Sequence, residues 1–345
     1  MKLKRFIMGA FMLMLVMALA ACASNEDSSS GTTNSSDEGA SGQEYTFKIA
    51  HVVQESHVWH QTAIKFGEEL DKLSDGRMKV EFFPASQLGA EADMVQQLET
   101  GAIDMGLMTN AYMSTREVSL NGWFMPYLFE NLEQAAEMRK SDEAKQMLDS
   151  LSSQGLIGLD FIFAGNRHIL MKDSFVNGPA DLKGKKVRII GSPSMQAYWE
   201  GVGAGPTPMP LNEVYQSLQT GVIDGIDIDL DALVTEKYYE QAEYLTLTNQ
   251  TTFPSVVVMS KVVFDGLSAE DQKIVQDALA TAAEWGVSEA IAREASNLET
   301  LKAAGVKVQE EIDVKQFADI STKVREDFSG QSDIIKSFIE TADSK

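Results

Sequence analysis

Hydrophobic positions recur with two different periods after residue 44. Short runs rich in β-branched and aromatic residues predict strands, and apolar residues spaced three and four apart predict helices. The predicted strands are 45–50, 78–83, 103–108, 156–164, 167–172, 186–190, 223–228, 245–248 and 253–259. The predicted helices are 57–73, 91–100, 143–153, 193–201, 211–219, 268–304, 313–328 and 333–342. The β-α-β-α-β order of the first five elements predicts a parallel sheet covered by helices, and hence the α/β class.

The longest helical pattern runs from Ser268 to Ala304. Ser268 and Asp271 are placed like a capping box at its start, and Gly305 suits its end. A helix of about 35 residues is unusual in a compact domain. We therefore expect Gly286 to mark a bend or a break.

The first 43 residues have a different composition from the rest of the chain. Three cationic residues precede an apolar run, 6–21, which is shorter than the roughly 20 residues that a membrane span needs. This pattern predicts a signal peptide over residues 1–21. Residues 22–43 are mostly Ser, Gly, Thr, Asp and Glu, which cannot bury enough surface to fold, so they predict a flexible linker.

The composition limits the number of domains and argues against several kinds of partner and site. A chain of 345 residues has room for about two domains. A net charge of −22 argues against nucleic acid as a partner. The single cysteine excludes an internal disulfide and zinc sites built on several thiolates. His57 and His60 lack a third ligand with suitable spacing, so no metal is predicted.

Motifs for catalysis are scarce. The sequence contains no G-x-S-x-G elbow, no phosphate-binding loop and no dinucleotide fingerprint, so no cofactor is predicted. A pair of carboxylates for glycoside hydrolysis stays open, because the chain has 51 acidic residues.

The β-branched run 186–190 begins at Lys186 and has one charge inside it, that of Arg188. We expect Arg188 near the end of a strand, where a ligand can reach it. A guanidinium is a planar fork of donors that matches a carboxylate. Ser192 and Pro193 predict the start of the next helix. Pro206 and Pro208 favour an edge strand.

Several longer words in the sequence resemble one receptor family. The central words are LKGKKVRI, GAGPTPMPLNEVYQSLQTG and VIDGIDIDL, all within residues 182–233. Earlier words are FPASQLGAEADMVQQLETGAIDMGLMT and NGWFMPYLF. Together they resemble the DctP-type extracytoplasmic receptors of tripartite (TRAP) transporters.

The resemblance implies a two-domain, periplasmic-binding-protein-like α/β fold of type II character, with a long helix that spans both domains. Domain I would hold residues 44–163, with a later return segment of about 253–345 that is shared, and domain II would hold residues 164–252. The protein would capture a small organic acid outside the cytoplasm, close around it and pass it to a membrane permease for Na⁺-coupled uptake. It would not be an enzyme. The Leu19-Ala20-Ala21-Cys22 word resembles a lipobox, which implies a lipid on Cys22 that anchors the protein to the membrane.

The resemblance also implies which residues bind the ligand. Arg188 would clamp the ligand carboxylate, and Arg167 would support the ligand or Arg188. His57 and Gln87 would contact the ligand from domain I, with Glu91 less firmly placed. Leu211 occupies a position where some receptors of this type carry an aromatic residue, which would make this pocket less aromatic.

The word DGIDIDLD departs from the DGQENPL of sialic-acid and several dicarboxylate receptors. Ile228 and Asp229 stand where those receptors have Asn and Pro. Asp227 or Asp229 would then accept hydrogen bonds from sugar hydroxyls or a ligand amine. Helix capping or simple solvent exposure are equally open roles for both.

These residues favour a sugar acid, such as a uronate, as the ligand. C4-dicarboxylates and other 2-oxo or hydroxy acids remain alternatives. Two other classes of protein also stay open, which are a secreted hydrolase with acidic catalysts and an adhesive surface lipoprotein.

Overall fold

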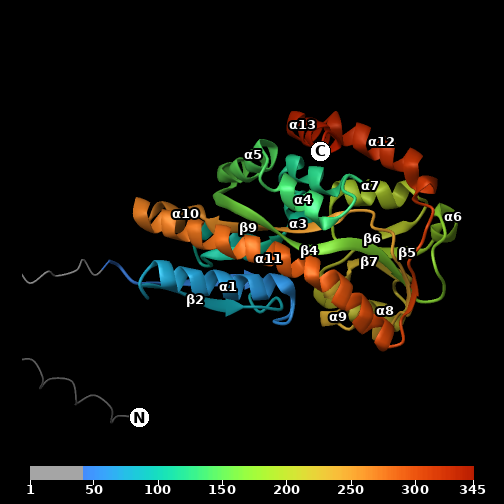
Figure 1. Cartoon of the computed structure of the whole chain (residues 1–345), viewed down its shortest axis with the longest axis horizontal. Coiled ribbons are helices and arrows are strands. Elements are labelled where there is room, and N and C mark those ends of the chain that lie inside the picture. Colours follow the sequence, from blue (N-terminus) through green and yellow to red (C-terminus); the bar gives the residue numbers. More distant parts are fainter. Residues whose placement is uncertain (1–41) are drawn as a thin grey trace, which may run out of the picture. The chain divides into compact units, whose positions relative to one another are not determined.

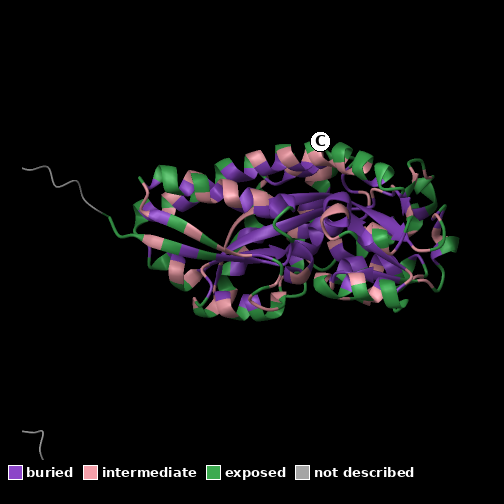
Figure 2. Ribbon diagram, turned by 90° about the horizontal axis from the view of Figure 1, so that it is seen from below, coloured by how far each residue is buried: buried purple, intermediate pink, exposed green. Residues whose placement is uncertain are grey.

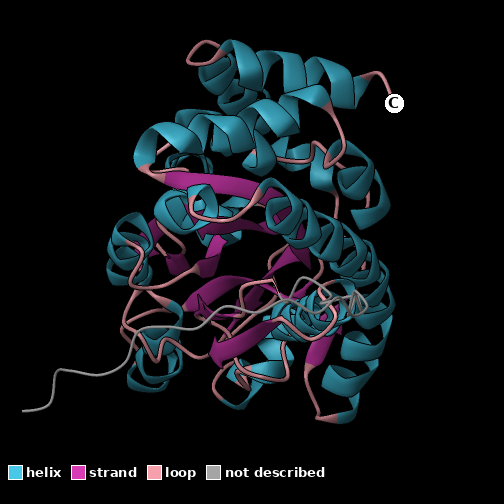
Figure 3. Cartoon of the chain, turned by 90° about the vertical axis from the view of Figure 1, so that its left-hand side faces the viewer, coloured by secondary structure: helices cyan, strands magenta, loops and turns pink. Residues whose placement is uncertain are grey.

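A mixed β-sheet with helices packed around it forms the frame of the protein (Figures 1 and 3). The structure is a computed structural model that describes residues 42–345. Its strands are ordered β2-β1-β3-β9-β4-β7-β5-β6, and β8 and β10 join beside β4. Strands are largely buried and helices expose their outer faces (Figure 2). The predicted α/β class is confirmed.

The first part of the sheet follows the predicted β-α-β-α-β order. Its strands are β1 (Tyr45–His51), β2 (Met78–Phe83) and β3 (Met105–Thr109), and β1 pairs in parallel with both others. The connecting helices are α1 (Val58–Leu73) and α2 (Glu91–Thr100). Because these strands are parallel, their carboxyl ends lie at one edge of the sheet.

A long strand, β4 (Leu156–Met171), crosses the middle of the sheet. Two strands were predicted there, and the structure has one. It pairs antiparallel with β9 (Thr252–Ser260) up to Asn166 and with β7 (Gly225–Asp229) from Arg167 onward. Register shifts at Gly158/Asp160 and at Phe163/Gly165 absorb the irregular residues without ending the strand.

The second part of the sheet holds β5 (Lys186–Ile189) between β6 (Gly205–Pro208) and β7, all parallel. β6 ends the strand order, which confirms the edge predicted from its two prolines. Ser192 stands at the N-cap of α7 (Pro193–Gly201), as predicted, but its hydroxyl bonds Asn121 and neighbouring serines instead of capping. The predicted helix 211–219 is a 3₁₀ turn, Leu211–Glu213, followed by α8 (Val214–Thr220).

The long helix is confirmed as α11 (Ala269–Ala303), which packs along α1, β4 and α9 (Leu230–Thr235). Ser268 Oγ accepts a hydrogen bond from Asp271 N at 3.1 Å, as the predicted start requires. The expected break at Gly286 is wrong, because α11 continues through this residue without interruption. Gly286 instead allows α1 to approach: a Cβ there would lie 2.5 Å from Thr62 Oγ1.

Shorter elements complete the chain, and most were not predicted. Helices α5 (Asp142–Ser150), α12 (Ala318–Ser329) and α13 (Asp333–Asp343) correspond to predicted ones. Those that were missed are α3 (Asn110–Met113), α4 (Leu132–Met138), α6 (Pro179–Leu182), α9, α10 (Lys261–Asp265) and β10 (Lys307–Gln309). β8 (Tyr244–Thr246) was predicted over 245–248.

Several predictions remain predictions. The signal peptide (1–21), Cys22 and nearly all of the linker (22–43) lie outside the described residues. Strands β4 and β9 and helix α11 contribute to both predicted domains, and the boundary between the domains stays an expectation. Within residues 42–345, no helix is both long enough and apolar enough to cross a membrane.

The contact between Gly286 and Thr62 predicts a specific packing defect. Gly286→Ala should lower the free energy of unfolding by about 1–3 kcal/mol through overpacking, although alanine has the higher helix propensity. Thr62→Ala removes the two side-chain atoms nearest to the new Cβ, so the double variant should recover the loss. Urea unfolding of both single variants and the double variant measures this coupling. Additive effects would contradict the proposed contact.

Candidate functional site

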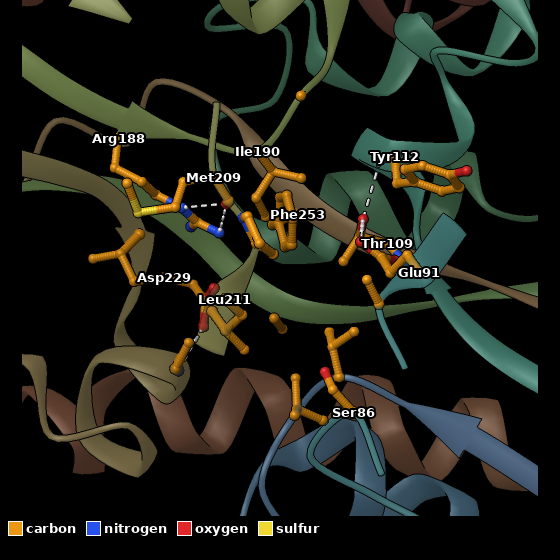
Figure 4. Close-up of a pocket in the computed structure, with 18 of the residues that line it drawn as sticks. Ser86, Glu91, Thr109, Tyr112, Arg188, Ile190, Met209, Leu211, Asp229 and Phe253 are labelled. Atoms are coloured by element: carbon orange, nitrogen blue, oxygen red, sulfur yellow. Dashed lines mark hydrogen bonds between the residues drawn. The ribbon is translucent and has the colours of Figure 1, made fainter. Parts of the chain in front are cut away.

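A cavity of about 300 Å³ lies among β5, β7, β9 and the segments that follow β1 and β2 (Figure 4). Most of its lining is apolar, with polar groups at a few points, as is typical of sites for small molecules. The polar and charged side chains that line it are His57, Ser86, Glu91, Thr109, Tyr112, Arg167, Arg188 and Asp229. Sequence analysis had named five of these eight.

Arg188 is the penultimate residue of β5, and its side chain is 0% exposed. Its Nε and Nη2 donate to Met209 O at 3.0 and 2.8 Å. Its Nη1 is buried with no hydrogen-bond partner. Burial lowers the pKa of Arg188 to about 10, so the guanidinium stays charged near neutral pH. A buried cation with a free donor at a cavity wall is suited to bind an anion.

Arg167 lies on β4 and is directed at two carboxylates of β7. Its Nε lies 2.5 Å from Asp227 Oδ1, its Nη1 lies 3.0 Å from Asp229 Oδ2, and its Nη2 bonds the carbonyl of Asp227. The guanidinium carbon also lies 4.2 Å from the centre of the Phe253 ring. The charge of Arg167 is therefore compensated inside the protein, whereas that of Arg188 has no carboxylate within bonding distance.

Asp227 and Asp229 were equivalent candidates in the sequence analysis, but the structure gives them different surroundings. Asp227 does not line the cavity, and its second oxygen accepts from Trp199 Nε1 at 2.8 Å. Asp229 lines the cavity and also caps α9, because its Oδ1 accepts from Ala232 N at 2.8 Å. Of the two, Asp229 is the one that a ligand in this cavity can reach.

His57 caps the start of α1 and lines the cavity. Its Nδ1 accepts from Trp59 N at 3.1 Å, which leaves Nε2 as the protonated nitrogen of a neutral ring. Nε2 lies 3.7 Å from Asp231 Oδ2 and 4.0 Å from Asp229 Oδ1. The start of α1 and the start of α9 therefore meet beside the cavity.

Glu91 is the first residue of α2 and lies in the cavity wall. Its Oε1 accepts from Thr109 N at 2.6 Å and its Oε2 from Thr109 Oγ1 at 2.9 Å. Burial raises the pKa of Glu91 to about 7, although these bonds and Arg188 act in the opposite direction. Figure 4 shows Glu91 and Arg188 on opposite sides of the cavity, with Phe253 between them.

Of the two remaining residues that the sequence predicted, one lines the cavity and the other does not. Leu211 lines the cavity as expected. Gln87 is exposed and does not line it, because the turn after β2 brings the preceding residue, Ser86, to the wall instead. Ser86 has a φ of 60°, a left-handed conformation that no local pattern indicated.

Sequence reasoning missed an aromatic wall. Trp59 stacks on Phe253 with ring centroids 5.9 Å apart, and Tyr112 also lines the cavity. Trp59 Nε1 is buried without a hydrogen-bond partner. The helical spacing of residues 57–73 gave no sign that Trp59 lies at a cavity wall.

Comparison with known proteins identifies the family. The model of bacterial extracellular solute-binding proteins, family 7 (DctP), matches residues 49–331. The chain belongs to this family. The resemblance seen in the sequence words is thereby confirmed.

Three relatives illustrate the family. A solute-binding protein of Roseobacter denitrificans is 33% identical over 71% of this chain and 75% of its own length. The 2,3-diketo-L-gulonate-binding periplasmic protein YiaO of Escherichia coli is 29% identical over 82% and 87%. A TRAP periplasmic solute-binding protein of Bradyrhizobium, solved in complex with galacturonate, superposes with a TM-score of 0.83 and 28% identity, covering 87% of this chain and 100% of that one.

In this family 7 protein, no group of three or more His, Cys, Asp or Glu side chains within residues 42–345 is arranged to hold a metal ion. The polar groups of the cavity are hydrogen-bond donors and acceptors placed around an apolar centre. Such an arrangement can bind and orient a small polar anion.

The raised pKa of Glu91 predicts a pH-dependent contribution to stability. A folded-state pKa of about 7, above the ordinary 4.5, means that stability is full below pH 4.5 and falls as pH rises towards 7. Gln can keep both contacts with Thr109 and carries no charge. Glu91→Gln should therefore raise the melting temperature of the ligand-free protein more at pH 8 than at pH 5. Equal shifts at the two pH values, measured by calorimetry, would show that Glu91 has an ordinary pKa.

Proposed function

We propose that this protein is the extracytoplasmic receptor of a TRAP transporter and binds a sugar acid through Arg188. The observation that carries the proposal is the guanidinium of Arg188, fully buried at the cavity wall with one donor unpaired. A carboxylate at Nη1 would supply both the missing hydrogen bond and the missing opposite charge. Membership of the solute-binding family supports the same role.

Features of the cavity favour a polyhydroxylated acid over an apolar one. Asp229 and Glu91 present carboxylate oxygens that accept hydrogen bonds from hydroxyl groups. Trp59 and Phe253 offer ring surfaces on which the apolar face of a sugar can pack. The relatives that bind diketogulonate and galacturonate, both sugar acids, support this class.

The mechanism we propose is closure around the ligand. Arg188 and Asp229 come from the second part of the sheet, while His57 and Glu91 come from the first. A ligand that touches both sets would favour a closed form over an open one. Only contacts that differ between the two forms can drive such a change.

Three further statements belong to the proposal. The protein is not an enzyme, since its relatives bind solutes and its cavity combines a carboxylate clamp with hydroxyl acceptors. It hands its ligand to a membrane permease of the TRAP type. A lipid on Cys22 tethers it to the outer face of the membrane, a step that mass spectrometry of the mature chain tests directly.

A panel of acids tests the ligand class. Residues 44–345 at micromolar concentration should show a rise in melting temperature with galacturonate or glucuronate in millimolar excess, because a ligand that binds only the folded state stabilises it by mass action. Succinate and 2-oxoglutarate represent the alternative acids. Turnover of chromogenic glycosides would instead support a hydrolase. The absence of any shift would support an adhesive protein.

Replacement of Arg188 tests the clamp. Arg188→Met removes the guanidinium but fills most of its volume, so the affinity for a bound acid should fall at least about tenfold by calorimetry. The melting temperature of the ligand-free protein should stay equal or rise, because a buried unpaired charge is lost.

Arg116→Ala provides the matched control. Arg116 is a partly exposed arginine that pairs with Glu99 and does not line the cavity, so its loss should leave affinity unchanged. Unchanged affinity in a well-folded Arg188→Met variant would refute the clamp.

A further inference from the structure

Two cationic side chains line the cavity, and only one of them has carboxylate partners. Arg167 and Arg188 are the only Lys or Arg side chains that line it in the described part of the chain. Arg167 is already shared by Asp227 and Asp229. Arg188 alone has no carboxylate partner, so the cavity offers one unpaired cation for an incoming anion.

The opposite side of the cavity is acidic. Glu91 faces Arg188 across Phe253 (Figure 4), and no Lys or Arg among residues 42–345 lies within 4.0 Å of the Glu91 carboxylate. Its orientation is fixed by a short chain of hydrogen bonds: Tyr112 N donates to Thr109 Oγ1, which donates to Glu91 Oε2. Thr109 N holds the other oxygen.

A carboxylate held in this way has acceptor capacity left. Each carboxylate oxygen has two lone-pair directions, and Thr109 occupies one on each. The remaining directions are available to donors. A hydroxyl group satisfies them, whereas a second carboxylate brings only acceptors and a like charge.

We propose that Glu91 makes the cavity selective for acids with one carboxylate at one end and hydroxyl groups at the other, and against dicarboxylates of the same length. This inference rests on the proposed function and refines its ligand class. Arg188 binds the carboxylate, and Glu91 accepts from the hydroxyl group at the far end. In a dicarboxylate the second carboxylate meets Glu91 at short range, in a partly buried site where repulsion is weakly screened.

Two open-chain acids form a matched pair of probes. Galactonate and galactarate share six carbons and four hydroxyl-bearing carbons, and they differ at C6, which is CH₂OH in one and carboxylate in the other. Titration calorimetry at pH 8, where Glu91 is ionised, should show that the wild-type protein binds galactonate at least about tenfold more tightly than galactarate.

Glu91→Gln should narrow that ratio at least about fivefold, since the amide keeps an acceptor and adds a donor but carries no charge. Asp93→Asn is the matched control. Asp93 lies on the same first turn of α2, bonds Ala90 N and does not line the cavity. Its neutralisation changes the net charge equally and should leave the ratio as in the wild type.

Two results would overturn the inference. One is a wild-type protein that binds galactarate as tightly as galactonate, which needs no variant. The other is a folded Glu91→Gln variant, verified by its melting curve, that keeps the wild-type ratio. Galacturonate is included as a further monocarboxylate, and whichever monocarboxylate binds serves as the reference. If the wild-type protein binds none of the three acids, the proposed function itself fails, and the selectivity with it.

Discussion

The candidate site depends on one buried cation, the guanidinium of Arg188. Taking a guanidinium out of water costs several kcal/mol unless its charge and donors are satisfied. At Arg188 the fold satisfies two donor groups with a single backbone carbonyl, that of Met209, and leaves the third unbonded. Because β5 is held between β6 and β7, the backbone at Arg188 cannot easily move to give the side chain better partners. The incompletely compensated charge of Arg188 thus lies on a strand that is held on both sides, where an anionic ligand can compensate it.

Arg167, the second buried arginine, does not need an anionic ligand to compensate its charge. Arg167 lies equally deep, but its charge is neutralised by the two carboxylates of β7, and Trp199 satisfies the remaining oxygen of Asp227. This network ties β4, β7 and α7 together and stabilises the wall on which Phe253 stacks over the guanidinium. Two buried arginines therefore have different roles: one holds the site in shape, and the other has a free donor for the ligand.

The sequence predicted those features that depend on residues close together in the chain. Periodicity found the strands of the sheet except β6, which two prolines indicated instead, and β10, and a charge inside a β-branched run singled out Arg188. Contacts between distant segments decided the rest. Asp227 and Asp229 are two residues apart on one strand, so alternation gives them the same face. Their roles differ because Trp199 of α7 binds Asp227, whereas Asp229 lines the cavity and caps α9. Gly286 was expected to bend or break a helix, but the residue that requires a glycine there, Thr62, is more than 200 residues away in the sequence.

The last structural link joins the two sides of the cavity without a ligand. Asp231, at the start of α9, accepts from Val58 N at the start of α1 and from Asn297 of α11, and it also pairs with Arg293 of α11. These bonds hold together elements from both parts of the sheet in the form described here. In the proposed closure they would form whichever acid is present, so they favour the closed state without distinguishing between ligands. Discrimination must then come from the groups that touch the ligand itself. Because Arg188 recognises a carboxylate that all of these acids share, the choice among them falls to the residues on the opposite wall.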